Sequence, residues 1–92
     1  MYLFSCKATA KKTTDDIQEG AESLFIVYIN YPDLFGAEHL CKLYLMAENF
    51  SNIVIEKRKQ LSQESINRLL EHDQDIQKAL KSGFHLRLFE CH

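Results

Sequence analysis

Six consecutive apolar residues run from Leu24 to Ile29, shortly before the proline at position 32. A run of this length suits a β-strand, whose successive side chains point to opposite faces of a sheet, and a membrane span would need about 20 residues. Because both faces of this strand are apolar, it must either be covered on two sides or present one face to a partner. Every arrangement of the rest of the chain has to satisfy one of these two conditions.

The other elements follow from the periodicity of the apolar residues. Residues 2–10, 52–58 and 84–89 have the character of strands, the first and last through alternation of apolar and polar positions. Asp33 is placed to cap a first helix, whose apolar residues recur at helical spacing from position 37 to 47. Ser62 is placed to cap a second helix that ends at Gly83, and the polar stretch 71–75 can split it, with Asp73 as a new cap.

These elements predict a single α+β domain over residues 1–92, in the order β-β-α-β-α-β. We expect one four-stranded mixed sheet, in which the first two strands are antiparallel and right-handed crossovers place both helices on one face. The opposite face of the sheet would then be partly open. The core is expected to include four aliphatic side chains: Ile53, Leu69, Leu80 and Leu86.

Charge and cysteine content narrow the class of protein. The formal net charge is −2, from 11 basic and 13 acidic residues, whereas a nucleic-acid binder is usually markedly basic. Three scattered cysteines are typical of a reducing compartment, and the first residues lack the basic and apolar regions of a signal peptide. We therefore expect a cytoplasmic protein that binds neither nucleic acid nor membrane.

Few residues are candidates for catalysis or for binding a metal. His85, Cys91 and His92 lie close together in the sequence but lack the paired spacing of zinc ligands. Cys41 lies on the apolar stripe of the first helix, so it is expected to pack rather than to act as a nucleophile. The sequence thus predicts no catalytic residue, no metal site and no cofactor, and we expect the chain not to be an enzyme.

Acidic and aromatic residues offer a surface for another protein. If both helices lie on one side of the sheet, the strand over 22–31 cannot bury both of its faces, so Phe25 and Tyr31 are candidate anchors for a partner. Asp15, Asp16 and Glu19 precede this strand and could steer a basic partner. We predict that these five residues form the binding site.

In size, compartment and architecture the chain resembles the compact α+β immunity proteins and antitoxins of the bacterial cytosol. This resemblance implies an inhibitor that neutralises a toxin or nuclease by occluding its active site. Three alternatives stay open: a phage-encoded inhibitor of a host defence complex, a small self-associating enzyme working as a homodimer, and a regulatory subunit that adds its edge strand to a partner sheet.

Overall fold

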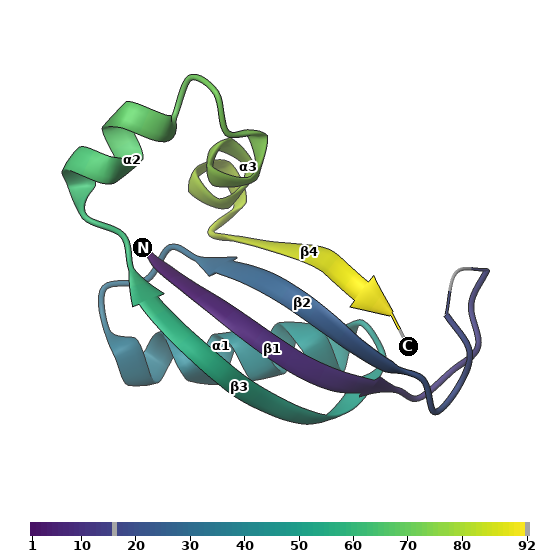
Figure 1. The fold of residues 1–92 in the computed structure, drawn as a ribbon. Coiled ribbons are helices and arrows are strands. Elements are labelled where there is room, and N and C mark those ends of the chain that lie inside the picture. Colours follow the sequence, from purple (N-terminus) through teal and green to yellow (C-terminus); the bar gives the residue numbers. More distant parts are fainter. Residues whose placement is uncertain (16, 92) are drawn as a thin grey trace.

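The computed structural model describes residues 1–15 and 17–91, with residues 90 and 91 in their backbone alone. Along the chain the elements are β1 (Tyr2–Ala10), β2 (Glu22–Ile29), α1 (Leu34–Ala47), β3 (Phe50–Gln60), α2 (Gln63–Leu69), α3 (Gln74–Ser82) and β4 (Phe84–Cys91). The strands form one sheet in the order β3-β1-β2-β4 (Figure 1). The predicted α+β class is confirmed.

The sheet is antiparallel throughout, so the expectation of a mixed sheet is wrong. β1 lies in the middle, where Phe4 pairs with Val27 of β2 on one side and with Arg58 of β3 on the other. Because β2 and β3 are both antiparallel to β1, the crossover through α1 joins two strands that run in the same direction without being neighbours. The antiparallel pairing expected for the first two strands is confirmed.

The predicted helix caps are confirmed by their hydrogen bonds. Asp33 Oδ2 accepts a hydrogen bond from the backbone N–H of Gly36 at 2.8 Å, and the Ser62 hydroxyl accepts one from the backbone of Ser65 at 3.1 Å. Asp73 Oδ1 accepts backbone hydrogen bonds at the start of α3, so the second predicted helix is divided into α2 and α3. Gly83 ends α3 with a φ of 89°, a conformation that glycine adopts without strain.

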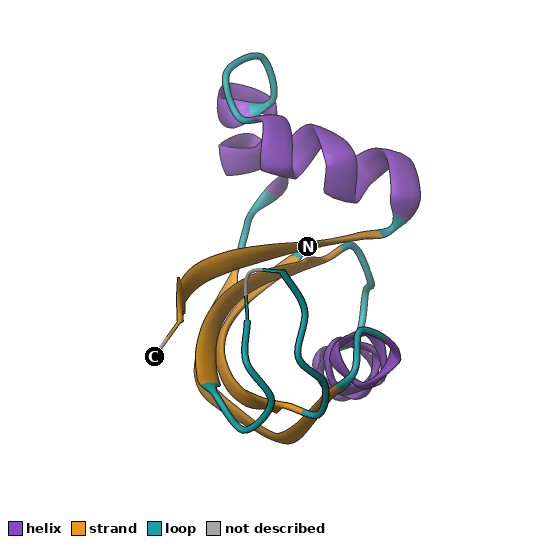
Figure 2. Cartoon of the chain, turned by 90° about the vertical axis from the view of Figure 1, so that its right-hand side faces the viewer, coloured by secondary structure: helices purple, strands orange, loops and turns teal. Residues whose placement is uncertain are grey.

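The helices cover both faces of the sheet, which corrects the expectation that they share one face. α1 packs on one side, here called the inner face, while α2 and α3 pack on the other, outer face (Figure 2). The reason is that β1 and β2 are apolar on both faces: Leu3, Ile26 and Tyr28 point outward and need cover of their own. The inner core includes the following buried side chains: Phe4, Cys6, Phe25, Val27, Ile29, Cys41, Leu45 and Phe50.

The outer core is smaller than the inner core. The helix residues buried in it differ from those that the sequence predicts. Ile66 of α2 and Ile76 of α3 are buried there, at 4% and 1% exposure. Leu69 and Leu80, which we expected in the core, are each 37% exposed. A single apolar stripe along residues 66–80 assumes one continuous helix. The helix breaks between residues 69 and 74, so α2 and α3 each bury a different set of residues.

Two cysteines meet inside the inner core. The Sγ atoms of Cys6 on β1 and Cys41 on α1 are 3.4 Å apart, and both residues are fully buried free thiols. The hydrogen bond with Cys6, together with burial, raises the pKa of the Cys41 thiol far above its ordinary value. Cys41 is therefore held as a neutral thiol, as expected for a packing residue.

Candidate binding surfaces

Residues of neighbouring strands form rows across the outer face of the sheet. The row closest to α2 and α3 contains Leu3 and Tyr28, and the helices cover it. Two rows further along β1, Lys7 pairs with Leu24 of β2 on one side and with Val54 of β3 on the other. Val54 is 53% exposed, and Leu24 is only partly buried. The helices thus cover one end of the outer face and leave apolar side chains accessible at the other end.

We call this uncovered part the outer patch, formed by Lys7, Leu24 and Val54. Its charge is modest because Lys7 Nζ lies 3.3 Å from Glu22 Oε1. The loop over residues 11–21 joins β1 to β2 at the same end of the sheet (Figure 1). The outer patch therefore offers accessible aliphatic side chains, while the loop at the same end of the sheet packs Ile17 against the inner core.

The structure separates the five residues predicted to bind a partner. Asp15 and Glu19 are exposed in the loop, and Asp16 lies outside the described residues. Phe25 is 6% exposed on the inner face, so the expectation that it points to an open face is wrong. Tyr31 is 41% exposed, but it lies before α1, at the opposite end of the sheet from the loop.

Tyr31 instead packs on the first turn of α1. A Cβ atom added to Gly36 would lie 2.5 Å from Cε2 of the Tyr31 ring, so the ring occupies the space that glycine leaves free. The outward side chains of β2 near the loop are aliphatic, Leu24 and Ile26, and not aromatic. The alternation of side chains along β2 places Leu24 and Ile26 on the same face of the strand. It does not show which face packs against α1.

A second surface lies under β4. A groove of about 520 Å³ lies along β4, and its lining includes Glu48 just after α1 and Lys78 of α3. Its volume is within the usual range of ligand pockets. The rings of Phe25 and Phe50 form part of its lining, with centroids 4.8 Å apart in edge-to-face contact. At the start of β4, Tyr44 of α1 stacks on Phe84 with ring centroids 3.8 Å apart. α1 packs mainly on β1, β2 and β3, so it covers β4 less than the other strands.

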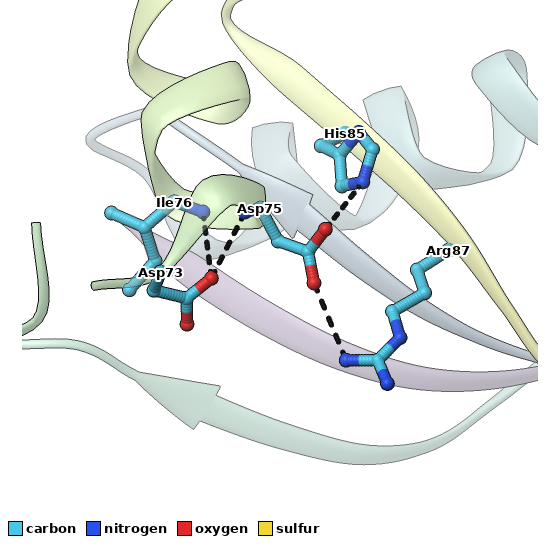
Figure 3. A network of polar contacts seen from close by, with 5 residues as sticks. All are labelled: Asp73, Asp75, Ile76, His85 and Arg87. Atoms are coloured by element: carbon cyan, nitrogen blue, oxygen red, sulfur yellow. Dashed lines mark hydrogen bonds and ion pairs between the residues drawn. The ribbon is translucent and has the colours of Figure 1, made fainter.

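A network of polar side chains connects α3 to β4 (Figure 3). His85 Nε2 lies 2.8 Å from Oδ1 of Asp75, and Arg87 donates a hydrogen bond of 3.3 Å to Oδ2 of the same carboxylate. Tyr28 lies next to this network, with its ring 6.1 Å from that of His85. Burial raises the pKa of Tyr28, and the carboxylates of Asp73 and Asp75 act in the same direction.

The raised pKa of Tyr28 predicts a loss of stability at alkaline pH. Above the ordinary pKa of 10, the unfolded chain gives up the phenol proton while the folded chain keeps it, so the free energy of unfolding falls as the pH rises. The slope from one such group reaches about 1.4 kcal/mol per pH unit. Tyr28→Phe should remove this part of the loss in urea unfolding between pH 8 and 11. Parallel pH profiles of the two proteins would contradict the assignment.

Other features that could point to an activity are few. Among residues 1–15 and 17–89, no three His, Cys, Asp or Glu side chains gather as a metal site would require. None of the described helices combines the length and apolar character needed to cross a bilayer. Comparison with known proteins finds no matching family model, no similar curated protein and no similar solved structure.

Proposed function

We propose that this chain is a small protein-binding inhibitor of the immunity or antitoxin type, which neutralises a toxin or nuclease by occluding its active site. The observation that carries the proposal is the outer patch, where Leu24 and Val54 stay accessible on a rigid antiparallel sheet. Accessible aliphatic side chains on regular strands suit a preformed protein interface, because little conformational entropy is lost on binding.

The neighbouring acids fit the same proposal. Asp15 and Glu19 are exposed on the loop beside the outer patch, where they would meet the basic rim of a nuclease-like site and speed its association. Within the loop, the backbone N–H of Glu19 donates a hydrogen bond to the Thr13 hydroxyl at 3.0 Å. The loop and the outer patch lie at the same end of the sheet, so a partner that covers this end would meet both.

The proposal predicts which substitutions weaken binding. Val54→Glu and Leu24→Glu place a charge in the outer patch and should weaken the complex by at least about 30-fold, the effect of losing an interface anchor. Leu43→Glu is the matched control, because Leu43 is 44% exposed on α1 and lies on the inner side of the sheet. Affinities should be measured on the partner recovered from the native host, together with thermal melts of each variant.

Two results would decide against the proposal. Binding that survives both outer-patch substitutions but is lost in Leu43→Glu would place the interface on α1. A partner that binds through the outer patch and keeps its full activity in the complex would favour a regulatory subunit over an inhibitor.

A further inference from the structure

Two thiols meet where α1 crosses the middle of the sheet. Cys6 belongs to β1 and Cys41 to α1, and their Sγ atoms are 3.4 Å apart. We call these two residues the thiol pair. Ala8 on β1 and Ala37 on α1 are fully buried in the same inner core. Small side chains on both elements let the helix approach the strand closely, so the packing of α1 on β1 holds the two sulfur atoms in contact.

A disulfide between the two thiols needs only a small further approach. An S–S bond is about 2.0 Å long, so the Sγ atoms would have to move about 1.4 Å closer together. β1 is held by backbone hydrogen bonds to β2 on one side and to β3 on the other, whereas α1 contacts the sheet through side chains. The adjustment therefore falls on α1 and on the two cysteine side chains.

The reduced thiol pair is shielded from oxidants. Neither cysteine has exposed surface, and the raised pKa of the Cys41 thiol keeps its proton in place. Because the thiolate is the form that reacts, oxidation requires a transient opening between α1 and the sheet that admits water and oxidant. Native proteins undergo local openings of this kind without unfolding as a whole. The thiol pair should therefore react slowly, under lasting exposure to an oxidant.

We propose that the thiol pair is a redox-sensitive device, in which hydrogen peroxide converts Cys6 and Cys41 into a disulfide that fixes α1 on the sheet. One thiolate attacks a peroxide oxygen, the O–O bond breaks, and a sulfenic acid and one water form. The second thiolate attacks the sulfenic sulfur, and hydroxide leaves and takes up the thiol proton as a second water. Both sulfur atoms are oxidised and the peroxide is reduced. The disulfide would lie on the inner face, so it does not depend on the proposed function.

Peptide mapping of the folded chain, kept in native buffer with hydrogen peroxide, tests this proposal. A digest without reductant should contain a peptide that joins Cys6 to Cys41, and dithiothreitol should separate its two halves. Cys91→Ser removes the third cysteine of the chain and should form the same disulfide. Thiols that persist at positions 6 and 41 after lasting exposure, or a disulfide from either of them to Cys91, would overturn the proposal.

Urea unfolding tests whether the disulfide fits the folded chain. Cys6 and Cys41 are 35 positions apart, and a cross-link over a loop of this length should lower the equilibrium constant of unfolding by about 100-fold. The comparison is between peroxide-treated and untreated chain, without reductant during unfolding. Cys41→Ala is the matched control, and treatment should not stabilise it. A cross-linked chain that is no more stable than the reduced chain would overturn the proposal that the disulfide fixes α1 on the sheet.

Discussion

Replacing Phe4 with alanine should lower the free energy of unfolding by about 3–5 kcal/mol, the cost of removing a large buried aromatic side chain. Phe4 has no exposed surface and lies on the central strand, facing α1 in the inner core. Because a small domain has only about 5–15 kcal/mol of stability, the variant should be close to unfolding at 25 °C. Urea unfolding followed by circular dichroism measures the difference.

Leu43→Ala is the control for Phe4, since it removes an aliphatic side chain that is 44% exposed on α1. It should cost well under half as much as Phe4→Ala. If Phe4→Ala cost less than about 1 kcal/mol, the inner core would not be packed around β1 as described.

Ile76→Ala should cost about 2–5 kcal/mol, because Ile76 is 1% exposed and holds α3 on the outer face. Leu80, on the same helix, is 37% exposed, and Leu80→Ala should cost clearly less. The sequence stripe alone predicted that Leu80 is core, so the pair of variants separates the two arrangements of α3. Equal losses in urea unfolding, or a larger loss for Leu80→Ala, would contradict the outer core.

The elements and their ends could be predicted because their signals are local. Asp33, Ser62 and Asp73 cap helices by accepting hydrogen bonds from N–H groups two or three residues further on, and each lies where the sequence predicts a helix to begin. Gly83 ends α3 for an equally local reason, its positive φ. No knowledge of the sheet is needed for any of these.

The arrangement of the elements depends on contacts between distant residues, and there the prediction failed. The alternation in residues 22–29 shows that two faces exist but not which of them meets α1, so Phe25 was assigned to the wrong side. The apolar run from Leu24 to Ile29 is also compatible with a strand covered on both faces. β2 is covered in this way at its end near α2 and α3, where Tyr28 is 7% exposed. Near the loop, Leu24 keeps part of its surface accessible.

The candidate surfaces were only partly predictable for the same reason. Asp15 and Glu19 were chosen from the sequence as steering acids, and their exposure agrees with that role, which stays a prediction. Leu24 and Val54 come together only through the register of β1 with both of its neighbours. Predicting the groove along β4 would require the order of the strands in the sheet. No short stretch of sequence contains that information.

The proposed inhibitor function is tested most directly by titrating the activity of the recovered partner with the purified chain. We expect activity to fall linearly and to reach zero at one chain per active site, as for tight occlusion. Val54→Glu should leave the partner active at that ratio, while Leu43→Glu should inhibit as the wild type does. Full activity at a saturating excess of the wild-type chain would contradict the proposal.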